Sequence, residues 1–129
     1  GLIARRITEV PGSSAYFLEG AVTYSNAAKI RTLGVSPTLL ETHGAVSSQC
    51  AEAMAKGMRD YASSDHAVSV TGIAGPDGGT EDKPVGTVFI GYSGVKGTKS
   101  IRLHLPGDRY LIRWRTSQAA LDYVRRQVM

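Results

Sequence analysis

A tyrosine and a lysine lie five residues apart where the sequence changes from a strand-like to a helix-like pattern. Tyr24 ends an apolar run, and Lys29 lies near the first turn of the helix expected next. A cation near a helix N-terminus is disfavoured, and a buried lysine tends to be neutral, so Lys29 could be a general base beside the Tyr24 hydroxyl. The spacing alone favours the plainer interpretation, a surface lysine and a space-filling tyrosine.

Ser25 and Arg109 offer two further chemical groups. Ser25 stands four residues before Lys29, as in a serine–lysine dyad, but a serine at this point is more readily the N-cap of the helix. Arg109 and Arg113 are four residues apart at the start of the last expected helix and could grip a phosphate with their forked donors. Arg109 is the better candidate, because the helix dipole does not stabilise a positive charge at a helix N-terminus. A bound anion would explain why an arginine stands there.

A glycine-rich loop follows the apolar run 67–70. It contains Thr71, Pro76 and four glycines, Gly72, Gly75, Gly78 and Gly79. Glycine lets other groups approach the backbone closely, and consecutive N–H groups in such a turn can bind an anion. The loop lacks the lysine of a Walker motif, and no helix follows it as the dinucleotide fingerprint requires. A ligand site is favoured over a plain surface loop, but the loop alone names no ligand.

Helix and strand signals predict the elements that position these groups. Capping residues and apolar periodicity predict helices over 2–10, 25–33, 36–42, 47–62 and 108–127. Runs of β-branched and aromatic residues predict strands over 21–24, 67–70, 85–95 and 99–105. The last two strands form an antiparallel hairpin, and the alternation of helices and strands before them predicts a parallel arrangement. We therefore expect a three-layer α/β/α sandwich around a mixed, mostly parallel sheet.

The composition is that of one globular domain, residues 1–129, without a membrane-spanning segment. The single cysteine, Cys50, suits a reducing cytoplasm, and the three histidines are too scattered to predict a metal site. The net charge of +4 lies in residues 101–129, which carry six arginines and two aspartates. A basic segment can contact nucleic acid. Two aspartates interrupt this one and it has no aromatic platform, so the sequence disfavours nucleic acid as a partner.

The first residues have the pattern of a helix whose start is not included. Leu2, Ile3, Ile7 and Val10 recur at helical spacing, but no capping residue and no initiator methionine precede them. We therefore expect that a longer chain continues upstream of Gly1.

Several blocks together resemble the CinA C-terminal domain, the nicotinamide-nucleotide amidase family of bacteria. The most specific are residues 24–29 (Tyr-Ser-Asn-Ala-Ala-Lys) and 71–79 (Thr-Gly-Ile-Ala-Gly-Pro-Asp-Gly-Gly). Supporting blocks lie at 1–4, 12–14, 33–35, 43–47, 83–88 and 107–109. The resemblance therefore runs from Gly1 to the last helix.

The resemblance implies hydrolysis of nicotinamide mononucleotide to nicotinate mononucleotide and ammonia, without a metal or a cofactor. The family's nucleophile is a serine in a Glu-Ser-Cys-Thr-Gly-Gly motif, and Gly1 matches the last glycine of that motif, so the serine would precede residue 1. Lys29 and Tyr24 match the residues that assist this serine. By the same match Thr71 and Arg109 contact the substrate, with Gly72 and Gly75 in the loop near the ribose phosphate. The 129 residues alone are expected to be inactive.

Other functions remain open beside the amidase. The alternative is a non-catalytic pyridine-nucleotide-binding or regulatory module of a competence- or damage-inducible protein. In either case the expected partner is a small-molecule nucleotide, and the resemblance leaves room for a homo-oligomer and for an N-terminal molybdopterin-binding-like domain in the full-length chain. DNA binding through the basic last helix ranks third.

Overall fold

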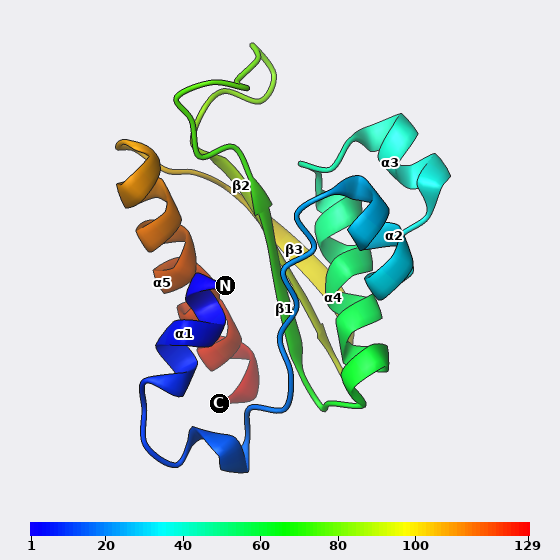
Figure 1. Cartoon of the computed structure of the whole chain (residues 1–129), viewed down its shortest axis with the longest axis vertical. Coiled ribbons are helices and arrows are strands. Elements are labelled where there is room, and N and C mark those ends of the chain that lie inside the picture. Colours follow the sequence, from blue (N-terminus) through cyan, green and yellow to red (C-terminus); the bar gives the residue numbers. More distant parts are fainter.

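The fold is built on a three-stranded sheet, and the computed structural model describes all residues from 1 to 129 (Figure 1). The strands are β1 (Ala67–Gly72), β2 (Thr87–Gly94) and β3 (Gly97–His104), in the order β1-β2-β3. Both neighbouring pairs are antiparallel. Every residue of the central strand β2 is buried, as expected for a strand that is covered on both faces.

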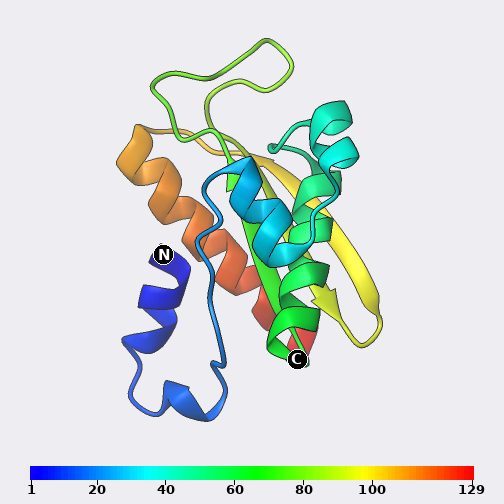
Figure 2. The same ribbon diagram turned by 45° about the vertical axis from the view of Figure 1, so that its right-hand side comes forward.

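Helices cover both faces of this sheet (Figures 1 and 2). One face carries α4 (Ser48–Ala62), against which α2 (Asn26–Leu33) and α3 (Pro37–His43) pack from outside. The opposite face carries α5 (Arg109–Val128), and α1 (Leu2–Thr8) packs against α5. The three layers that the sequence predicts are therefore present.

Capping side chains fix where four of the helices begin. Ser25, Ser36, Ser47 and Asp108 each accept a hydrogen bond from a backbone N–H three residues further on. Such a cap satisfies one of the amide groups that a helix start leaves without a partner. α1 has no side-chain cap at Gly1.

Helix α4 lies very close to the sheet and to α2. A Cβ added to Gly91 of β2 would lie 2.2 Å from the carbonyl oxygen of Ala51, and one added to Gly57 would lie 2.0 Å from that of Leu33. The hydroxyl of Ser69 on β1 donates to the same Ala51 carbonyl, at 2.5 Å. Only glycine at these two positions permits such a close approach of two backbones.

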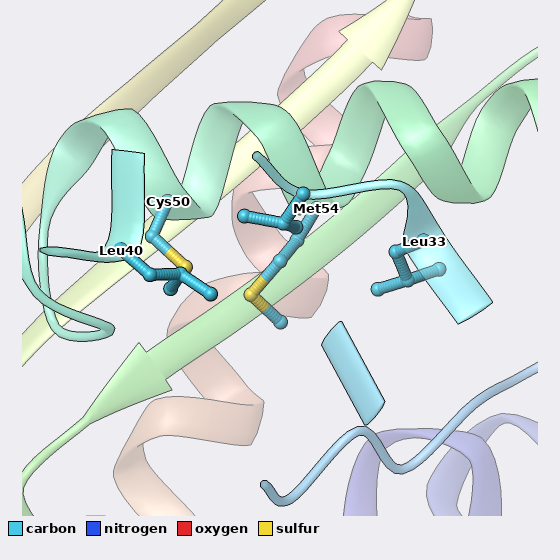
Figure 3. Close-up of a cluster of buried hydrophobic side chains, with 5 residues drawn as sticks. Leu33, Leu40, Cys50 and Met54 are labelled. Carbon is cyan, nitrogen blue, oxygen red and sulfur yellow. The ribbon is translucent and has the colours of Figure 1, made fainter. Parts of the chain in front are cut away.

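Two apolar clusters form the core. The first lies between α2, α3 and α4 and contains Leu33, Val35, Leu40, Cys50 and Met54, most of which Figure 3 shows converging. The second lies between the sheet and α5 and contains Val88, Ile90, Ile112 and Ala120. The two clusters hold the helical layers to opposite faces of the sheet.

An arginine joins α1 to α5. The guanidinium of Arg6 donates to Ser117 at 2.9 Å and to Gln118 at 2.7 Å, and it lies 4.2 Å above the ring centre of Trp114. A cation over an indole face is an attractive arrangement. Arg6 therefore contacts three residues of α5 from its place on α1.

The prediction of a mixed, mostly parallel sheet is wrong. The loop 73–86 joins β1 to β2 without a helix, so the chain reverses direction and the two strands pair antiparallel. The expected strand at 21–24 is also absent, since no backbone N–H from Leu18 to Tyr24 bonds to a backbone carbonyl. These residues run instead as an extended segment that leads into α2 (Figure 1).

No helix of the chain combines the length and the apolar composition that a membrane crossing requires.

Candidate functional site

Lys29 is held in a buried position by the chain that precedes it. Its side chain is only 6% exposed, and its Nζ donates to the carbonyl oxygens of Thr23, at 2.8 Å, and Tyr24, at 3.4 Å. Ser25 turns the chain between these residues, and its hydroxyl accepts from the Ala28 N–H at 3.1 Å. The hydroxyl of Ser25 is thus the helix cap expected from the sequence, which leaves the dyad with Lys29 without support.

No carboxylate lies within ion-pair distance of Lys29, since all four ion pairs of the structure are elsewhere. An ammonium group has three N–H donors, so the two carbonyl contacts leave one donor free. The charge of Lys29 acts on the thiol of Cys50 on α4. Burial raises the pKa of the Cys50 thiol, and the charge of Lys29 opposes this rise.

Arg109 joins the glycine loop to the segment before α2. It is the first residue of α5, directly after the cap Asp108. Its Nη1 donates to the carbonyl oxygen of Gly75 at 2.8 Å, and its Nη2 donates to the hydroxyl of Tyr24 at 3.4 Å. The forked guanidinium therefore connects three segments that are far apart in the sequence.

Thr71 and the two glycines of the expected site form the exit from β1. The hydroxyl of Thr71 donates to the carbonyl of Ala45, in the link before α4, at 2.7 Å. A Cβ on Gly72 would lie 2.9 Å from the Thr87 carbonyl oxygen. Gly75 has a φ of +81° and precedes a cis bond to Pro76, and a Cβ there would lie 2.6 Å from the Val85 side chain. Glycine is needed at both positions for steric reasons alone.

A cleft of about 410 Å³ opens beside Arg109. Its walls come from the glycine loop and from the start of α5: Ala74, Pro76, Val85, Gly107, Asp108, Arg109 and Tyr110. Tyr110 was not predicted from the sequence as a site residue. No sequence signal marked it, because Tyr110 belongs to none of the motifs, and in the structure its ring is 71% exposed.

The structure brings some predicted site residues together and keeps others apart. Tyr24, Gly75 and Arg109 are joined by hydrogen bonds, whereas the hydroxyl of Tyr24 bonds to Arg109 and not to Lys29. Tyr24 is 82% exposed, so it does not fill space in a core. Arg113 is exposed and forms no side-chain hydrogen bond or ion pair. No three histidine, cysteine or acidic residues gather as metal ligands would.

The predicted site residues supply several kinds of chemical group, and among these residues only Arg109 lines the cleft. The set contains one buried amine without an acidic partner, one guanidinium, one exposed phenol and a loop of close-packed backbone. Such groups can transfer a proton and hold an anion.

Comparisons with known proteins agree over the whole chain. The family model described as the CinA C-terminal domain matches residues 1–128. The CinA-like protein of Geotalea uraniireducens is 55% identical over 129 residues, and that of Koribacter versatilis is 50% identical over the same length. This chain spans 31% of the length of each of these relatives.

Two solved structures have the same fold. The competence/damage inducible protein CihA of Agrobacterium tumefaciens matches with a TM-score of 0.97 and 41% identity, over 100% of this chain and 79% of its own. The competence damage-inducible protein A of Klebsiella pneumoniae matches with a TM-score of 0.95 and 30% identity, over 99% and 80%. The chain belongs to the CinA C-terminal domain family.

Proposed function

We propose that the protein containing this chain is an amidohydrolase that converts nicotinamide mononucleotide to nicotinate mononucleotide and ammonia. The observation that carries the proposal is the burial of Lys29, whose amine has no acidic partner and, in its neutral form, can donate its two N–H groups to the carbonyls of Thr23 and Tyr24 and keep its lone pair free. The family membership and the Tyr24–Arg109–Gly75 contacts beside it also support the proposal.

In the proposed mechanism the nucleophile is a serine that precedes Gly1 in the longer protein. The amine of Lys29, when unprotonated, takes the proton of the serine hydroxyl, and the oxygen attacks the carboxamide carbon. The tetrahedral intermediate collapses when the C–N bond breaks, and the departing nitrogen takes the proton held by Lys29 and leaves as ammonia. Water then attacks the acyl-enzyme ester, which releases nicotinate mononucleotide and restores the serine.

The remaining site residues bind and orient the substrate in this proposal. Arg109 supplies positive charge for the phosphate of the nucleotide, and backbone N–H groups near the upstream serine motif or near Thr71 and Gly72 stabilise the oxyanion. Gly75 keeps its carbonyl on Arg109 and so holds the guanidinium in place. Tyr24 positions Arg109 through its hydroxyl, which lies 3.4 Å from Nη2.

The test is a Lys29→Ala variant of the full-length protein. Loss of a general base lowers turnover by roughly 10²- to 10⁴-fold, while substrate binding changes little. Ammonia release from nicotinamide mononucleotide gives the turnover, and calorimetry gives the binding. A Lys29→Met variant also lacks the amine but retains more of the buried volume. Equal loss of turnover in a folded Lys29→Met variant would show that the missing amine, and not unfolding, is the cause. Unchanged turnover in both variants would refute the role of Lys29.

A binding or regulatory module is the second candidate. The exposed position of Tyr24 favours it, because the hydroxyl contacts Arg109 and does not touch the amine of Lys29. A full-length protein with an intact serine that binds nicotinamide mononucleotide but releases no ammonia would support this function over the amidase.

A further inference from the structure

A second cleft, separate from the one beside Arg109, lies on the α4 face of the sheet. It has a volume of about 370 Å³ and is formed by the residues before and at the start of α4, by Lys83 in the loop 73–86, and by Phe89 and Arg102 on β2 and β3. It shares no residue with the first cleft. We call it the basic cleft, after Lys83 and Arg102.

The two cations of the basic cleft are fixed by backbone carbonyls. Lys83 Nζ donates to the His43 carbonyl at 3.0 Å, and Arg102 Nη2 donates to the Asp82 carbonyl at 2.6 Å. The guanidinium of Arg102 also lies 5.5 Å from the ring centre of Phe89. These contacts hold both side chains in place but use only some of their N–H donors.

Neither cation is neutralised by a carboxylate. The four ion pairs of the structure involve other residues, so no acidic oxygen lies within 4.0 Å of Lys83 Nζ or of the Arg102 nitrogens. The first turn of α4, which borders the same cleft, carries no acidic residue either. Two oriented positive charges therefore face the cleft together with the hydroxyl of Ser48 and the amide of Gln49.

Strand register places Arg102 two strands away from Thr71 of the candidate functional site. Thr71 of β1 pairs with Phe89 of β2, and Phe89 pairs with Arg102 of β3. Neighbouring strands lie about 4.8 Å apart, so the backbones of Thr71 and Arg102 are roughly 10 Å apart, with Phe89 between them. Arg102 therefore lies on the far side of Phe89 from Thr71. Ser47 at the other wall, in contrast, is two residues from Ala45, whose carbonyl Thr71 contacts.

We propose that the basic cleft binds a phosphate group, either as free phosphate or as the monoester of a small molecule. Phosphate suits the cleft because a lysine and an arginine donate from different directions, and forked guanidinium donors match its oxygens. The volume is large enough for a phosphate with a small organic substituent. The proposal does not depend on the amidase activity.

The test is a titration of the chain with inorganic phosphate at constant ionic strength, followed by backbone amide NMR. We expect saturable shifts at Ser48, Gln49 and Lys83, and at least about a tenfold loss of affinity in Lys83→Gln and in Arg102→Gln. A second titration with glycerol phosphate distinguishes the two kinds of ligand. A site for monoesters should bind glycerol phosphate more tightly than inorganic phosphate, whereas a site for free phosphate should not.

Lys99→Gln is the matched control, because it removes one exposed charge from the same strand as Arg102. It should leave the affinity unchanged, and Lys83→Arg, which keeps the charge, should retain binding. Each variant is folded if its amide chemical shifts are spread as widely as those of the parent chain. Shifts that never saturate, or an equal loss in Lys99→Gln, would overturn the proposal.

Discussion

Lys29 shows what residue patterns can and cannot predict about the site. The change from strand-like to helix-like sequence placed it near a helix start, and its burial follows from the turn at Ser25. The partner of Tyr24 could not be predicted, because Arg109 lies 85 positions later in the sequence and reaches it only through the fold. The roles of Lys29 and Arg109 in catalysis and binding remain predictions.

Cys50 gives a prediction about pH at the scale of one residue. Burial raises the pKa of its thiol above the ordinary value of 9.0, so the unfolded chain loses this proton at a lower pH than the folded chain. Below the ordinary pKa the thiol is protonated in both states, and its stabilising effect on the fold is fully present. As the pH rises above that value, the unfolded chain loses the proton first and the free energy of unfolding falls. We expect the melting temperature to fall more steeply above about pH 9 in the parent chain than in Cys50→Ala.

The comparison of the two chains isolates Cys50, because the other groups that titrate at alkaline pH are common to both. Equal slopes of melting temperature against pH would contradict the prediction. A thiol reagent provides a second measurement, since the buried thiol should react slowly in the native chain and rapidly in denaturant.

At the scale of elements, local signals predicted the helices well. Ser25, Ser36 and Asp108 cap helices that begin where the sequence indicates, and the hairpin of β2 and β3 is confirmed. The direction of β1 relative to β2 was predicted wrongly, because the alternation of helices and strands earlier in the chain was given more weight than the absence of a helix between these two strands. The run 21–24 has strand-forming residues, but strand structure also needs a paired neighbour, and the structure provides none.

Gly57 gives a prediction about the packing of two helices. Replacing a glycine inside a helix by alanine ordinarily stabilises the helix by about 1 kcal/mol. Here the new methyl group would lie 2.0 Å from the Leu33 carbonyl oxygen, so α2 and α4 must separate. We expect Gly57→Ala to lower the free energy of unfolding by about 1–3 kcal/mol, as measured by denaturant titration.

Lys56→Ala, one residue earlier on the exposed side of α4, serves as the control. It removes only a surface ion pair with Asp60, so the free energy of unfolding should stay within about 0.5 kcal/mol of the parent value. A stabilised Gly57→Ala variant would mean that the contact between α2 and α4 is looser than described.

At the scale of the whole molecule, the surface is large for the mass. The accessible area is 7665 Å², whereas a folded monomer of 13.7 kDa typically exposes about 6,600 Å². The extended segment 18–24 contributes to this excess, since Leu18, Val22 and Tyr24 are each more than half exposed.

The same segment gives a prediction about local stability. None of the N–H groups from Leu18 to Tyr24 bonds to a backbone carbonyl, whereas those inside α4 do. We expect the amides of 18–24 in the 129-residue chain to exchange with deuterium far faster than those of α4, as measured by hydrogen exchange. Protection of 18–24 comparable to that of α4 would show that the segment pairs with another strand.

The contact of Arg6 with Trp114 makes the attachment of α1 to α5 directly visible in fluorescence. Trp114 is the only tryptophan, so all indole emission comes from this one contact between the two helices. Trp114 is already 42% exposed, and detachment of α1 removes the guanidinium from the ring and exposes more of the indole to water, which moves the emission to longer wavelengths. Undocking of the first helix can therefore be followed by its own optical signal, separately from the circular dichroism of the sheet and the other helices.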